Sequence, residues 1–205
     1  MDDRWPALTV HDEDLIAERV VSEHDEPFER ERDARLTADP PAATDVLMVE
    51  PFTEDHPATF EITFTNTSEN DLEVGFGPTP PFGGYVGHRD DRSMIQLLPL
   101  DAETRSLHPD RLVPNSQTDG VWRAKESFVI PDLLTLRVIA PGESLRGRYA
   151  LVAPATEDEP AAEGGRTNDG GGFLRGTYTF KDSYRLEGWA EEGSFLRWQF
   201  SISVT

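Results

Sequence analysis

Hydrophobic and polar residues alternate with a period of two over much of the chain after residue 45. In the most regular stretch, residues 195–204, Leu, Trp, Phe, Ile and Val alternate with Arg, Gln and Ser. Because successive side chains of a strand point to opposite faces, this pattern predicts a half-buried β-strand. Alternation or short apolar runs predict further strands at 46–52, 58–65, 72–76, 94–98, 121–124, 127–130, 134–138, 145–151 and 173–181.

The alternation breaks and restarts within FEITFTNTSENDLEVGFG, residues 60–77. The break covers residues 66–70, and it predicts a connection between two strands, because Asn, Ser and Asp side chains bond nearby backbone in turns. The triplet Asn66-Thr67-Ser68 also satisfies the glycosylation sequon, and a turn would expose it. Asn66 is therefore a glycosylation candidate, although such triplets also arise by chance.

Three other regions carry no such regular signal. Residues 12–37 fit a short helix or a strand equally well, and Pro27 interrupts them. The segment 38–43, ADPPAA, predicts a connector because proline donates no backbone hydrogen bond. Residues 154–172, rich in Gly and acidic residues, predict a long loop.

Many short strands separated by turns, with no helices between them, predict an all-β fold of two packed antiparallel sheets. A parallel α/β fold would need helices that the sequence does not contain, and a single closed barrel is the main competing architecture. We expect an acidic N-terminal segment, 1–44, partly packed on a β-sandwich formed by residues 45–205.

The charge is strongly unbalanced, with 39 acidic and 19 basic residues and a net charge of −20. A disordered acidic tail, a partner that is basic, or a surface adapted to molar salt would each explain it. Molar salt screens charges over about 3 Å, which removes self-repulsion. Arginine instead of lysine, and carboxylates spread along the chain, favour salt adaptation. A net-negative chain also argues against nucleic-acid binding.

The absence of cysteine excludes disulfides, thiolate catalysis and zinc–thiolate sites. The first ten residues show neither a basic start nor an apolar run, and no stretch of 18 apolar residues occurs, so neither a signal peptide nor a membrane span is predicted. The expected location is the cytoplasm, or outside the cell if a signal segment is missing from this chain.

Five stretches carry a family resemblance: FTNTSENDLEVGFG, PPFGG, VWR, APGESLRGRYAL and GTYTF. Together they resemble immunoglobulin-like β-sandwich domains of halophilic archaea and, more distantly, intracellular proteinase inhibitor (BsuPI-like) domains. The resemblance covers residues 58–204 and implies an immunoglobulin-like sandwich in which a Gly-x-Tyr tyrosine bonds nearby backbone. Many relatives have cysteines where this chain has Val121 and Phe173. No catalytic residue is implied.

Candidate catalytic chemistry is sparse. His88, Asp90 and Asp91 could hold a divalent cation, because imidazole and carboxylate groups together suit such ions, although a hydrated loop explains them as well. The segment 167–172, TNDGGG, lacks the spacing of a calcium loop. Ser144 lies in a strand turn, and the serine hydrolase sequence G-x-S-x-G is absent.

The loop GPTPPFGGY, residues 77–85, is the main candidate for binding. Proline and glycine fix its path, while the aromatic side chains of Phe82 and Tyr85 offer apolar surface for a partner. The alternative is that both rings cap the core. The predicted binding residues are Pro80, Pro81, Phe82, Gly83 and Tyr85.

The sequence thus predicts a non-catalytic interaction or accessory module for high salt, with a protein partner and no cofactor. One alternative is a proteinase inhibitor that presents a rigid loop at 78–85 or 99–120. The other is a metal-dependent hydrolase built on His88, Asp90 and Asp91.

Overall fold

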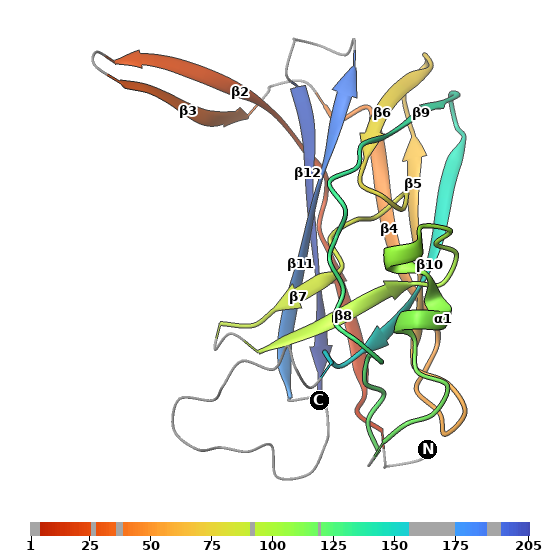
Figure 1. The fold of residues 1–205 in the computed structure, drawn as a ribbon. Coiled ribbons are helices and arrows are strands. Elements are labelled where there is room, and N and C mark those ends of the chain that lie inside the picture. The colour runs from red at the N-terminus through yellow and green to blue at the C-terminus, as the bar shows by residue number, and fades with distance from the viewer. Residues whose placement is uncertain are drawn as a thin grey trace.

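The computed structural model describes residues 5–25, 28–35, 39–90, 93–118, 120–155, 175–187 and 194–205, with backbone alone for 19–25 and 28–35. Strands dominate this part of the chain (Figure 1). They are β1 (Leu8–Asp12), β2 (Ile16–Asp25), β3 (Phe28–Arg35), β4 (Ala42–Glu50), β5 (Thr59–Asn66), β6 (Leu72–Phe76), β7 (Val86–His88), β8 (Met94–Pro99), β9 (Thr135–Ile139), β10 (Ser144–Val152), β11 (Gly176–Glu187) and β12 (Ser194–Val204). A 3₁₀ turn, η1 (Arg105–Leu107), and one helical turn, α1 (Pro109–Leu112), lie between β8 and β9. Neither could span a membrane.

All the strands belong to one antiparallel sheet, ordered β3-β2-β12-β11-β7-β8-β10-β5-β4. β1 pairs with β12 and also lies beside β4, so the sheet curls round into a nearly closed, barrel-like form. The predicted all-β antiparallel class is confirmed. The continuous sheet is closer to the barrel alternative, and the division into two immunoglobulin-type sheets stays a prediction.

Most of the predicted strands are found within a few residues at their ends, but β11 runs to Glu187, whereas the predicted strand ends at residue 181. The ambiguous segment 12–37 forms the hairpin β2–β3, which extends away from the barrel in Figure 1, so its strand alternative is correct. The strands predicted at 121–124 and 127–130 are wrong, because these residues form only isolated bridges and an extended segment. The segment 1–44 supplies strands to the same sheet, and β4 begins at Ala42.

The core is unusually aromatic. The rings of Phe180 and Phe200 stack with centroids 5.0 Å apart, and Trp198 lies 4.9 Å from Phe200. Offset and edge-to-face pairs of this kind contribute beyond the area that they bury. Trp122 is buried and donates to the Thr53 carbonyl at 3.1 Å.

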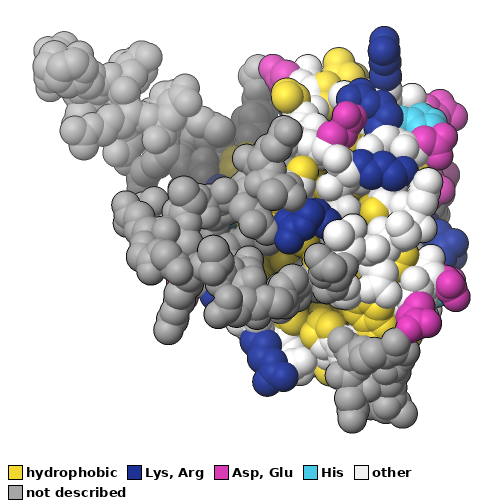
Figure 2. All heavy atoms as spheres, turned by 60° about the horizontal axis from the view of Figure 1, so that its bottom comes forward, with side chains coloured by type: hydrophobic (Ala, Val, Ile, Leu, Met, Phe, Trp, Pro, Cys, Tyr) yellow, Lys and Arg dark blue, Asp and Glu magenta, His cyan; other side chains and the backbone are white. Residues whose placement is uncertain are grey.

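Charges on the surface are mixed. On the face shown in Figure 2, Asp and Glu side chains occur singly or in small groups among Lys, Arg and polar residues, and they do not form one acidic block.

Candidate interaction surface

The predicted binding loop, 77–85, closes a gap in the barrel wall. Along one edge of β11, β6 pairs with Arg185–Glu187 and β7 pairs with Thr179, so no strand covers the residues between. The loop connects β6 to β7 across this gap. Its apolar side chains therefore point inward.

Phe82 and Tyr85 are 1% and 0% exposed, so the expectation that they offer apolar surface is wrong, and the core-capping alternative is correct. Phe82 packs edge-on against the rings of Tyr149 and Trp198, with centroids 5.7 and 5.8 Å away. Pro81 is buried as well. Pro80 and Gly83 are partly exposed, and they are the two predicted binding residues that solvent can reach.

Tyr149, from the Gly-x-Tyr stretch GRYAL, holds the loop in place. Its hydroxyl accepts a hydrogen bond from the Phe82 amide at 3.2 Å and lies 3.2 Å from the Phe82 carbonyl, to which it donates. The resemblance implied a tyrosine that bonds nearby backbone, whereas these partners lie 67 residues away in sequence. Burial raises the pKa of Tyr149 well above 10, so the hydroxyl keeps its proton and can donate.

Asp182 lies beneath the same loop. Its carboxylate accepts the Gly83 amide at 2.7 Å and the Ser183 amide at 2.8 Å. Burial raises the pKa of Asp182 from 3.8 to about 6, although the amides of Gly83, Ser183 and Gly84 lower it. This carboxylate therefore titrates close to neutral pH.

A groove with a volume of about 380 Å³ runs over the outside of the barrel beside this loop. Residues of β6, β11, β12 and the loop form its floor, and residues 130–134 form one wall. It is lined by Gly75, Phe76, Gly77, Pro78, Gly83, Ile130, Pro131, Asp132, Leu133, Leu134, Asp182, Ser183, Arg185 and Phe195. Leu134 lies across Gly75, where an added Cβ would come within 2.8 Å of its Cδ1 atom. The groove is open to solvent, and polar and apolar groups both contribute to its lining.

The wall of the groove belongs to a larger exposed surface, which we call the apolar ridge, residues 129–138. Among the described residues, six of the eight exposed large hydrophobic side chains lie on it: Val129, Ile130, Leu133, Leu134, Leu136 and Val138. Isolated exposed hydrophobic residues are common, but six of them within one ten-residue segment make this segment the main candidate for an interaction surface.

Strand β9 turns its apolar residues outward. Leu136 pairs with Gly75, and Val138 pairs with the exposed Glu73, whereas Ile139 pairs with the buried Leu72. Leu136 and Val138 are 48% and 63% exposed, and Ile139 is fully buried. Among the described strands β9 pairs with β6 alone, so its other edge is free.

Asn66 is a structural residue and not an exposed glycosylation site. Its side chain is 0% exposed, and its amide nitrogen donates to the carbonyls of Asn70 and Ile139, both at 2.8 Å. Its side-chain oxygen accepts from the amide and the hydroxyl of Ser68. The nitrogen that a glycan would modify is buried and fully bonded, so the expectation of an exposed sequon is wrong.

The backbone of Asn66 joins two corners of the fold. It donates to the Glu143 carbonyl at 3.0 Å and accepts from Gly142 at 2.9 Å. Gly142, with φ of 74°, takes the third position of the turn Ala140–Glu143, where positive φ favours glycine. Asn66 thus links the β5–β6 connection to the β9–β10 connection at the end of the apolar ridge.

The predicted metal ligands His88 and Asp90 are exposed at the end of β7, and Asp91 lies outside the described residues. No group of three His, Asp or Glu side chains that could hold a metal occurs within the part of the chain that the structure describes. The segment 167–172 lies outside that part.

A contact that sequence reasoning missed joins His11 Nε2 to Ser203 Oγ at 3.2 Å. Ser203 Oγ also lies 2.9 Å from Thr177 Oγ1. The three side chains therefore form a row of polar contacts across β1, β12 and β11, and this arrangement does not identify Ser203 as an activated serine.

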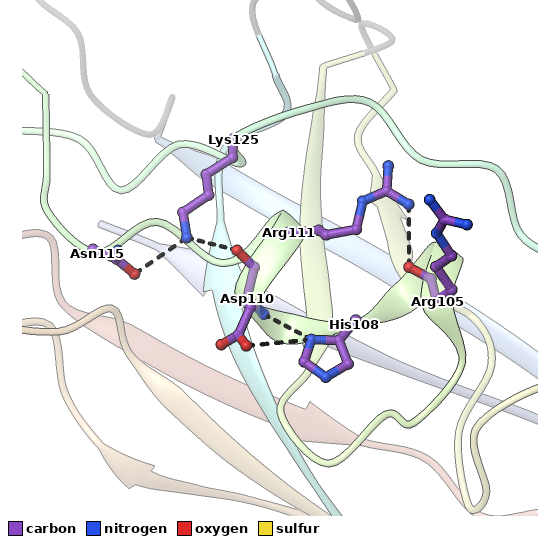
Figure 3. A network of polar contacts seen from close by, with 6 residues as sticks. All are labelled: Arg105, His108, Asp110, Arg111, Asn115 and Lys125. Carbon is purple, nitrogen blue, oxygen red and sulfur yellow. Dashed lines mark hydrogen bonds and ion pairs between the residues drawn. The ribbon is translucent and has the colours of Figure 1, made fainter.

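The predicted loop 99–120 is held by a polar network (Figure 3). Lys125 donates to the Asp110 carbonyl at 2.9 Å and to Asn115 Oδ1 at 3.1 Å. His108 accepts from the Asp110 amide, and Arg111 donates to the Arg105 carbonyl. These contacts fix the path of an exposed loop.

Comparison with known protein families, with curated proteins and with solved structures found no match for the chain.

Proposed function

We propose that this chain is a non-catalytic interaction module that binds another protein through the apolar ridge. The observation that carries the proposal is the outward direction of Leu136 and Val138 on β9, which has no partner on its outer edge among the described strands. Burying such side chains against a partner gains about 25 cal/mol per Å² of apolar area removed from water.

The charge of the ridge supports the same function. Residues 127–140 contain one acidic residue, Asp132, and one basic residue, Arg137, in a chain with 39 acidic residues. A surface that must stay hydrated in molar salt would carry carboxylates here as elsewhere. Their scarcity fits a surface that a partner covers.

A different protein fits better than a second copy of this chain. Molar salt screens the net charges of two copies, but a dimer docked ridge to ridge would also bring together the groove residues Asp132 and Asp182 of both chains, and salt screens partly buried carboxylates much less. A partner with basic side chains avoids this repulsion.

The test is affinity capture in molar salt with the wild type, with Leu136→Asp on the ridge, and with Leu47→Asp on β4 as the matched exposed control. We expect a protein that the wild type and Leu47→Asp retain and that Leu136→Asp loses, and that rebinds as a purified component. Equal capture by all three chains would refute the proposal. Dimerisation of the chain itself, lost in Leu136→Asp, would replace the partner with a second copy.

Proteinase inhibition is the second candidate. It is favoured by the network around Lys125, which fixes the exposed loop 99–120, because a rigid loop binds a protease at low entropic cost. Inhibition of a protease panel in molar salt that Lys125→Ala weakens, and that Leu136→Asp leaves intact, would favour this candidate over the ridge.

A further inference from the structure

Asp182 occupies an unusual position in the barrel. The core-facing side chains of β11 are otherwise buried and mostly aromatic: Tyr178, Phe180, Tyr184 and Leu186. Asp182 stands in the middle of this row, and its contacts are the backbone amides of Gly83 and Ser183. No cationic side chain contacts it among the described residues. A carboxylate without a counter-charge among aromatic residues marks a candidate functional position.

The groove connects this carboxylate to solvent. Asp132 on the ridge lines it as well, and so does Arg185, whose Nε atom is already paired with Glu187 at 2.7 Å. The groove is therefore lined by two carboxylates and one guanidinium, and the Nε atom of that guanidinium is paired with Glu187, which does not line the groove. Its apolar wall, with Leu133 and Phe195, suits the aliphatic stem of a long side chain.

We propose that the groove binds the cationic side chain, arginine or lysine, of the protein that docks on the apolar ridge. This inference rests on the proposed function and names the chemistry that the partner must present. The aliphatic stem would pack beside Leu133 and Phe195, and the charged head would reach Asp182 and Asp132. Hydrogen bonds between ionised groups are about twice as strong as neutral ones, and exclusion of water strengthens them further.

The test uses agmatine, a four-carbon stem with a guanidinium at one end and a primary ammonium at the other, as the probe, and N-butylurea as an uncharged molecule with a stem of the same length. Binding is followed at one fixed salt concentration through the NMR shifts of the Gly83 and Ser183 amides, which contact Asp182 directly. We expect agmatine to move both signals and to bind at least tenfold more tightly than N-butylurea.

Two groove variants and one control variant test whether agmatine binds in the groove. Asp182→Asn should weaken agmatine at least tenfold, and its side-chain oxygen can still accept the Gly83 amide, so the loop keeps this contact. Asp132→Asn, at an exposed position, should weaken it several-fold without affecting folding. Asp45→Asn, exposed on β4, is the matched control and should leave the affinity unchanged.

Equal affinities for agmatine and N-butylurea, or no loss of affinity in Asp182→Asn and Asp132→Asn, would overturn the inference and leave Asp182 as a clamp for the loop. This failure is separate from failure of the proposed function. Leu136→Asp would still lose the partner if the ridge binds without a cation, and the agmatine titration requires no partner at all.

Discussion

The 77–85 loop and the apolar ridge face each other across one groove, and both differ from what their sequences suggest. The loop contains Pro and Gly, which usually mark an exposed connection, yet Phe82 and Tyr85 are buried. The ridge contains a strand with regular alternation, which usually buries its apolar residues, yet Leu136 and Val138 are exposed. In both regions the position in the sheet decides burial, because the loop fills a gap in the wall and β9 lies at an edge.

The strongest test of this difference is a pair of substitutions to alanine, one in the loop and one on the ridge. Phe82→Ala should lower the free energy of unfolding by about 3–5 kcal/mol, because it leaves a cavity among five other aromatic rings. Leu136→Ala should change it by less than about 0.5 kcal/mol. Denaturant unfolding in molar salt measures both free energies. Equal effects would mean either that Phe82 is not in the core or that Leu136 is not on the surface.

Part of this arrangement is predictable from the sequence, and the reason is local. β12 alternates over its whole length because it is paired on both sides and covers the core with one face, so period alone identifies it. β11 alternates only as far as Phe180 before Asp182 interrupts its apolar row, which is why the predicted strand ends at residue 181 and misses the part that runs to Glu187. β7, with three residues, is too short to show a period. The β2–β3 hairpin extends beyond the barrel, and its sequence fits no single period.

The candidate site was harder to predict, because its features depend on contacts distant in sequence. Asn66 has the composition of an exposed turn, but the carbonyl that it satisfies belongs to Ile139, 73 residues away. In the sequence, Asp182 resembles any other acidic residue. Only the alternation of β11 places it between Phe180 and Tyr184 on the core-facing side of the strand. That local break in an apolar row was the available signal.

The next largest effect concerns Asn66, which anchors the buried end of the ridge strand. Asn66→Ala should cost about 2–4 kcal/mol, because the buried Ile139 carbonyl loses the Asn66 side-chain donor and the Ser68 amide keeps only the Pro41 carbonyl. Asn70→Ala is the control, because Asn70 contributes its backbone carbonyl to this corner. If the two variants unfold with the same free energy, the side chain of Asn66 does not anchor this end of β9.

A third prediction concerns pH. The folded chain holds the proton of Asp182 more tightly than an unfolded chain, in which its pKa is near 3.8, so Asp182 favours the folded state at low pH and loses this contribution as pH rises through about 6. The contribution is at most about 3 kcal/mol, and access of water to the groove reduces it.

Asp182→Asn cannot ionise, so the difference in unfolding free energy between this variant and the wild type should grow in favour of the variant from pH 4 to pH 7. Comparing the two chains removes the titration of the other carboxylates, which both share. A constant difference across this range would mean that Asp182 has an ordinary pKa and is well hydrated.

Tyr149→Phe should cost about 1–2 kcal/mol, because it removes the hydroxyl that contacts both backbone groups of Phe82 and keeps the ring in the core. We expect hydrogen exchange at the Phe82 amide to accelerate more than exchange at amides of β12. Unchanged exchange at Phe82 would show that the packing of its ring alone holds the loop.

The smallest expected effect is on the ridge. Replacing Leu136 and Val138 with Thr should change the unfolding free energy by no more than about 0.5 kcal/mol, because the β-branched Thr side chain suits a strand and little apolar burial is lost. The same double variant should bind less of an apolar dye such as bis-ANS, since the exposed apolar area is smaller. A loss of stability above about 1.5 kcal/mol would place these side chains in the core of the isolated chain. The ridge and the 77–85 loop would then be two parts of one packed interior, and the surface proposed for the partner would not exist.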